Sequence, residues 1–116
     1  MDYIKIIKKR ISKDELMSFL DRPFSEMIKF VVDTERRIIA LGGEMHADAE
    51  QILLKDGSRQ ENLWGGNIYP KFKGEEKFEF TSLINIRPSR NNSSMEIEDD
   101  NIRDKVKKIA EELLNY

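Results

Sequence analysis

The sequence predicts an α+β fold: about five strands in a mostly antiparallel sheet, with three helices packed on one face. Residues 78–87 alternate between apolar and mostly polar positions, which is typical of a strand with one covered side. Residues 102–114 repeat apolar positions at intervals of three and four, which is typical of an amphipathic helix. The 116 residues are expected to form a single domain, 1–116, with a core that needs no disulfides.

Three strands are expected in the N-terminal half, at residues 3–7, 27–33 and 37–41, because these segments are rich in β-branched and apolar side chains. The pattern of 27–33 alone also allows a helix. However, a turn at Asp33-Thr34-Glu35 favours a hairpin between the second and third strands.

A short helix is expected between the first two strands. Ser12 and Glu15 have capping-box spacing, so each can satisfy a free N–H group of the first turn. The apolar positions continue to Leu20, and Arg22-Pro23 is expected to end the helix.

Residues 45–56 have the apolar spacing of a helix, with Gly57 placed to end it in the left-handed conformation. The alternative is a strand turning at Asp56-Gly57, but the acidic residues at the start favour a helix. A fourth strand is expected at 63–69, closed by Pro70, and a fifth at 78–87. Asp99 or Asp100 is expected to cap the C-terminal helix.

Composition narrows the function classes. There is no Cys, which excludes Cys-based zinc sites, Cys nucleophiles and thiol redox chemistry. With 20 basic and 22 acidic residues the net charge is −2, so we do not expect a nucleic-acid partner. No apolar run approaches the ~18 residues of a membrane span, and the N-terminus lacks a signal-peptide pattern. We therefore expect a cytoplasmic protein without a membrane partner.

His46 is the single His of the chain and the candidate acid or base. On a helix it lies one turn from Glu50, a spacing that suits a metal or an oriented general base. A zinc site needs three or four protein ligands, so we predict no metal site and no cofactor. The competing interpretation is that His46 only packs or caps at an acidic helix N-terminus, with an oxygen-rich magnesium or calcium site as a lesser alternative.

Two further segments hold the candidate ligand-binding residues. In the first, Trp64 adjoins a Gly pair that permits close approach of a ligand or backbone, although a lone Trp is more often a core residue. In the second, arginines and amides form a donor-rich loop suited to a phosphate or carboxylate, unless the four acids that follow it neutralise the arginines. The candidates are Trp64, Asn67, Asn85, Arg87, Arg90 and Asn91.

Two segments also carry a family resemblance: Leu63-Trp64-Gly65 with Asn67 and Tyr69-Pro70, and Ile84-Asn85-Ile86-Arg87-Pro88. With Gly42-Gly43-Glu44-Met45-His46 upstream, the chain resembles an uncharacterised family of small bacterial and archaeal proteins, classed as a domain of unknown function. The resemblance covers nearly the whole chain and implies a stand-alone cytoplasmic domain. It implies no activity, cofactor or catalytic residue. The family tends to have Pro where this chain has Asp100, a local change in the helix cap.

Two hypotheses for function follow. The first is a small binding or interaction protein that forms a homo-oligomer and has a polar patch from residues 63–70 and 84–94. The second is an enzyme acting on a phosphorylated or carboxylated small molecule, with His46 as acid or base and Arg87 and Arg90 as anion binders. No signature motif of a major enzyme class is present.

Overall fold

The computed structural model describes residues 3–21 and 23–115. Five strands form one sheet in the order β1-β3-β2-β4-β5, and every neighbouring pair is antiparallel. Their bounds are β1 Ile4–Ile7, β2 Ile28–Asp33, β3 Ile38–Gly42, β4 Leu63–Ile68 and β5 Phe78–Glu79. Three α-helices accompany the sheet: α1 Lys13–Met17, α2 His46–Lys55 and α3 Asp100–Leu114. The predicted fold class and the β2–β3 hairpin are confirmed.

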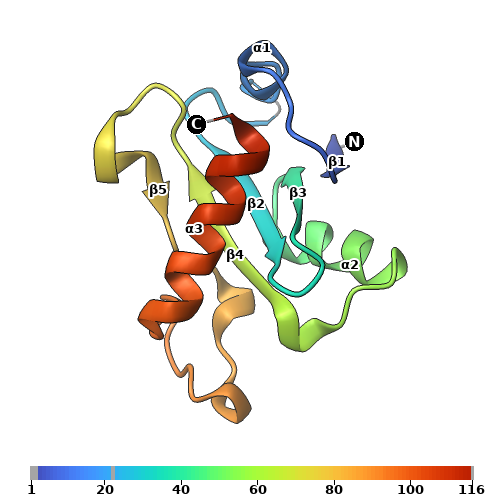
Figure 1. Ribbon diagram of the computed structural model, residues 1–116, viewed down its shortest axis with the longest axis vertical. Helices are drawn as coiled ribbons and strands as arrows, with labels where there is room; N and C mark the ends of the chain where they lie inside the picture. Colours follow the sequence, from blue (N-terminus) through green and yellow to red (C-terminus); the bar gives the residue numbers. More distant parts are fainter. Residues whose placement is uncertain (1–2, 22, 116) are drawn as a thin grey trace.

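The helices lie on both faces of the sheet, whereas the sequence predicted one. Successive residues of β2 face opposite sides of the sheet: Phe30 packs with α1 and α3, and Val31 packs with α2. The reason is visible in β3, where every residue is buried, because a strand that is apolar on both faces needs cover on both. In Figure 1, α3 crosses in front of β2 and β4.

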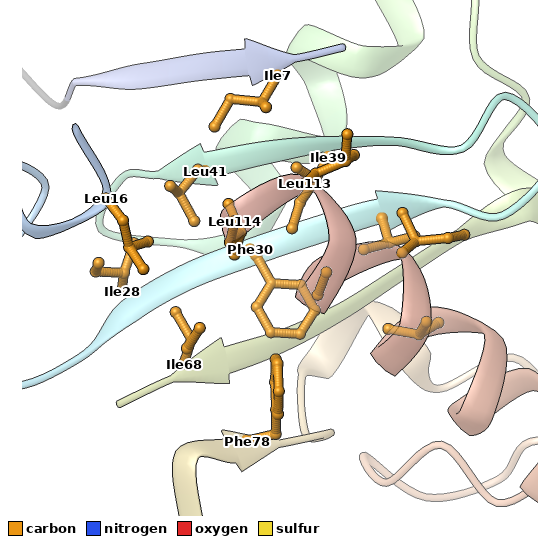
Figure 2. Close-up of a cluster of buried hydrophobic side chains, with 14 of the residues drawn as sticks. Ile7, Leu16, Ile28, Phe30, Ile39, Leu41, Ile68, Phe78, Leu113 and Leu114 are labelled. Carbon is orange, nitrogen blue, oxygen red and sulfur yellow. The ribbon is translucent and has the colours of Figure 1, made fainter. Parts of the chain in front are cut away.

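The larger core lies between the sheet and α3. Figure 2 shows Phe30 near its centre, with Leu114 of α3 on one side and Phe78 of β5 on the other. The Phe30 and Phe78 rings meet edge to face at 6.3 Å, a favoured aromatic geometry. The apolar stripe of α3 packs against β3 and β2, and β2 pairs along its length with β4, which positions the site described below.

The helix ends follow the predicted caps. Ser12 Oγ accepts from the Glu15 N–H, and Asp99 Oδ1 accepts from the N–H groups of Asn101 and Ile102. Gly57 follows α2 with φ +107°, so the predicted helix there is confirmed over the alternative hairpin. Helix α1 ends at Met17, earlier than predicted, and Arg22 lies outside the described residues.

The predicted strand at 78–87 is wrong beyond Glu79. The chain instead makes a single bridge from Thr81 to Glu96 and then a 3₁₀ turn at Leu83–Asn85. The alternation predicts that Ile86 lies on the covered side of a strand, but its side chain is 42% exposed. No helix in the described part of the chain is long and apolar enough to cross a membrane.

Candidate functional site

The segment after β5 is held beside β4 by hydrogen bonds from one side chain, that of Asn85. Asn85 is fully buried, and its amide brackets the backbone of Gly65: Oδ1 accepts from the Gly65 N–H at 2.9 Å, and Nδ2 donates to the Gly65 carbonyl at 3.0 Å. Asn85 therefore makes the two hydrogen bonds that a neighbouring strand would make. This pairing fixes the segment 82–87 beside β4.

Gly65 and Gly66 let other groups approach β4 closely on both faces. A Cβ at Gly65 would lie 2.8 Å from the Ser82 side chain and 3.2 Å from the His46 ring. A Cβ at Gly66 would lie 2.6 Å from the Phe30 ring. The Gly pair therefore serves packing of the protein itself, with His46 seated directly on the strand.

His46 is the first residue of α2 and is 8% exposed. Its Nε2 lies 2.7 Å from the Gly66 carbonyl. A carbonyl can only accept, so Nε2 carries the hydrogen in this contact. Burial lowers the pKa of His46, with an opposing contribution from the bond to Gly66. The ring is therefore neutral at pH 7, and Nδ1 keeps its lone pair.

A cleft of about 270 Å³ opens beside this ring, and we name it the His46 cleft. Its polar lining residues are Lys29, Glu44, His46, Asn67, Thr81 and Ser82. Its apolar lining residues are Met45, Ala47, Leu83, Ile84 and Met95. Met45, Leu83 and Met95 are exposed large apolar side chains, whereas His46, Asn67 and Ser82 of the same lining are buried. Burial lowers the pKa of Lys29, and Glu79 opposes that effect.

Asn67 lies in the His46 cleft, and one atom of its side-chain amide lacks a hydrogen bond. It is 8% exposed, and its Nδ2 donates to Glu79 Oε1 at 2.9 Å. Because a carboxylate only accepts, this bond fixes which end of the amide is the oxygen. Asn67 raises the pKa of His46, yet no donor in the described residues meets Oδ1 with hydrogen-bond geometry.

Arg87 lies on the other side of the Leu83-Ile84 turn, between β4 and α2. Its side chain is 10% exposed, its Nη2 lies 3.3 Å from Glu50 Oε2, and its guanidinium carbon lies 5.1 Å from the centre of the Trp64 ring. Burial lowers the pKa of Arg87, and Glu50 opposes that effect. Within the described residues Nη1 has no acceptor, although it is buried.

A second cleft, of about 320 Å³, opens at Arg87, and we name it the Arg87 cleft. Its lining residues are Glu50, Gln60, Glu61, Leu83, Ile84, Ile86, Arg87, Ser89 and Arg90. Arg90 is close enough to lower the pKa of Arg87 by repulsion. Glu61 is within ion-pair distance of Arg59, at 3.5 Å. The donor-rich character predicted for this segment therefore belongs to a concave surface.

The acids that follow the arginines bond elsewhere. Glu96 accepts from Thr81, and Glu98 accepts from the backbone of Ser93 and Ser94. Asp99 caps α3, and Asp100 pairs with Arg103. Arg87 instead uses Glu50 of α2, the same helix that carries His46.

The predicted site residues lie on or near β4, but some are buried and others are exposed. Trp64 is 1% exposed and supports Arg87 from the core, while Asn85 is structural by its contacts. Asn91 is exposed and ends the 3₁₀ turn Pro88–Arg90 with φ 58°. His46 and Arg87 line different clefts that share Leu83 and Ile84.

Sequence reasoning missed two residues of this site and the role of a third. Helical spacing predicts that Glu50 lies beside His46, whereas Glu50 pairs with Arg87, and nothing in the sequence singles out Lys29 as a lining residue of a cleft. Asn92 is buried and donates to three carbonyls, those of Asn85, Ser94 and Glu96. A run of Asn and Ser reads as an ordinary turn, and no pattern in it distinguishes the structural Asn92 from the exposed Asn91.

Comparison with protein families gives one match. A family model described as "Protein of unknown function (DUF5674)" matches residues 5–113. The chain belongs to this family. Comparisons with curated proteins and with solved structures gave no match. The family match spans both clefts and every candidate residue, so the site is part of the matched domain.

Proposed function

We propose that the protein binds a small molecule through an anionic group, a carboxylate or phosphate, in the Arg87 cleft. One observation carries the proposal: Arg87 has a buried guanidinium whose Nη1 lacks an acceptor. A buried donor without a partner costs about 1–3 kcal/mol, and an anion held by that group would remove this cost. A small rotation of the guanidinium toward the cleft would be needed for that contact.

Two arginines and two glutamates line the Arg87 cleft, so the support for an anion comes from how these charges are paired. Arg87 and Arg90 repel one another, and Glu50 reaches Arg87 through only one nitrogen. Among the described residues, no carboxylate is within ion-pair distance of Arg90. Ser89 and Gln60 add a hydroxyl and an amide to the same lining. The Arg87 guanidinium also lies 5.1 Å from the centre of the Trp64 ring, a contact that a planar guanidinium favours.

The test is calorimetric titration with inorganic phosphate and with succinate as probes. Wild-type protein is expected to bind at least one of them, and Arg90→Gln should weaken that binding about five-fold or more, because an exposed charge–charge contact is lost. Arg10→Gln is the matched control, since it removes the same charge from a guanidinium that bonds Asn115 instead. Equal effects of the two variants, or no binding by wild type, would contradict the proposal.

An enzyme is the second candidate, favoured by the neutral imidazole of His46. In this version the anion binds Arg87 and Arg90, and the reacting part of the substrate passes Leu83 and Ile84 to reach His46. His46 would accept a proton through Nδ1. Turnover of a phosphate-monoester or ester library by wild type, lost in His46→Gln, is the expected outcome. Turnover that survives in His46→Gln would remove His46 from that role.

Self-association is a further part of the proposal. In the described residues β1 pairs only with β3, so its outer edge is open to another strand. Light scattering over a range of concentrations tests this directly. A mass that stays at the 13.6 kDa of one chain would count against self-association.

A further inference from the structure

We infer that the His46 cleft is a second binding site, for an uncharged hydrogen-bond donor (an amide N–H, amine or hydroxyl group) carried on a small apolar body. This site is separate from the anion site proposed above. It rests on two adjacent acceptors without donors, on the shape of the cleft and on its charge.

The first acceptor is Asn67 Oδ1. Glu79 takes the Nδ2 donor of the same amide and so prevents an amide flip from exchanging oxygen and nitrogen. Within the described residues Oδ1 remains without a hydrogen bond. An unsatisfied buried carbonyl is uncommon in folded proteins and is relieved by a donor from outside the chain.

The second acceptor is His46 Nδ1. The bond from Nε2 to the Gly66 carbonyl places the hydrogen on Nε2, so the neutral ring can only accept at Nδ1. No group in the described residues meets Nδ1 with hydrogen-bond geometry, although the Asn67 side chain is close enough to the ring to raise its pKa. Asn67 and His46 line the same cleft, so an NH₂ group, with two hydrogens, could donate to both acceptors, and a hydroxyl could donate to one of them.

The walls and the charge define the rest of the ligand. Met45, Leu83 and Met95 are at least 40% exposed and surround the polar floor, which is the arrangement of a small-molecule site. Lys29 is the cation of the lining, and it is balanced by Glu44 in the lining and by Glu79 nearby. The cleft therefore has no excess positive charge for an anion.

The experiment compares benzamide with N,N-dimethylbenzamide, which has the same aromatic body and no N–H donor. Binding to full-length protein is followed by the NMR signals of the His46 ring and the Asn67 side-chain amide. Benzamide is expected to bind about ten-fold more tightly, the typical net effect of one to two hydrogen bonds. Equal shifts from both compounds would overturn the inference, as would no shift from either.

Variants separate this site from the anion site. Asn67→Leu is expected to abolish the ten-fold preference, whereas Arg90→Gln should leave benzamide binding unchanged and weaken phosphate binding. If Asn67→Leu does not fold, the comparison of the two compounds on wild-type protein still decides. A crystal structure in benzamide with only a water on Asn67 Oδ1 would also overturn the inference. Failure of both phosphate and succinate to bind would contradict the Arg87 proposal and leave this one standing.

Discussion

At the scale of single residues, His46 shows how the backbone sets the protonation of a side chain. Because the imidazole sits on Gly65 and is buried, its pKa is lowered from the ordinary value. The hydrogen bond to the Gly66 carbonyl then selects the tautomer with hydrogen on Nε2. The close seat on Gly65 thus contributes to the burial that keeps the ring neutral, and the Gly66 carbonyl selects the tautomer of the neutral ring.

The lowered pKa of His46 predicts a pH-dependent stability. The unfolded chain binds a proton at a higher pH than the folded chain does, so the free energy of unfolding is at its full value above about pH 6.5 and decreases as the pH falls toward the folded pKa. Urea denaturation between pH 7.5 and 5.5 should show this decrease. His46→Gln, which can still donate to Gly66, should flatten it.

Because the chain has one His, the same prediction has a direct spectroscopic check. The ring signals should titrate with a midpoint below the ordinary value of about 6.5. A midpoint above that value would show that the charged ring is favoured in the fold, and would contradict the neutral tautomer derived from the Gly66 contact.

Gly66 gives a second residue-level prediction. Gly66→Ala would place a Cβ 2.6 Å from both the Phe30 ring and the Glu79 carbonyl. We expect a loss of about 1–3 kcal/mol in the free energy of unfolding, because the core must shift to admit a methyl group. Gly74→Asn is the control, since Gly74 has open space and a φ of +66° that Asn tolerates. Thermal denaturation of the two variants would contradict the prediction if their losses were equal.

At the scale of elements, the site depends on a side chain that replaces a strand. The chain beyond β5 does not continue the sheet, and the Asn85 amide bonds Gly65 in its place. Its Nδ2 also donates to the Met95 carbonyl at 3.0 Å, which joins the return segment to the same point. Both clefts are lined by residues of this segment, so Asn85 positions their walls.

Asn85→Ala should therefore destabilise the fold by at least about 2 kcal/mol, since it leaves the Gly65 N–H and two carbonyls without partners. Hydrogen exchange gives the specific readout: the Gly65 amide should exchange much faster, relative to amides in the centre of β2, than in wild type. Asn91→Gly is the matched control, because Asn91 is exposed at positive φ. An unchanged Gly65 exchange rate would contradict the role given to Asn85.

The segment after β5 is also the part of the fold that could not be predicted from the sequence. Hairpin β2–β3 and helices α2 and α3 were predictable, because apolar periodicity and caps are local properties of the chain. Residues 80–87 also alternate, but an alternating pattern cannot reveal that Asn85 will pair with Gly65, twenty residues earlier. Likewise the Arg87–Glu50 pair joins residues 37 apart, and only the fold brings them together.

At the scale of the whole molecule, the sheet separates two apolar clusters. One contains Trp64 and the α3 residues, and the other contains Leu53 of α2 with Leu63. Both clusters use alternate residues of the same strands, so neither can lose its packing without disturbing the strands that hold the other. We therefore expect all 116 residues to unfold as one cooperative unit.

Leu53→Ala tests that expectation. It removes a fully buried side chain from the α2 cluster and should cost about 2–5 kcal/mol. Trp64, the one Trp of the chain, reports by fluorescence on the opposite cluster. In a single cooperative unit, the fluorescence midpoint should move to lower urea by the same amount as the circular-dichroism midpoint. A Trp64 transition that stays at the wild-type midpoint would mean that the α2 layer unfolds independently, and that the wall of the two clefts formed by α2 can open while the sheet and α3 remain folded.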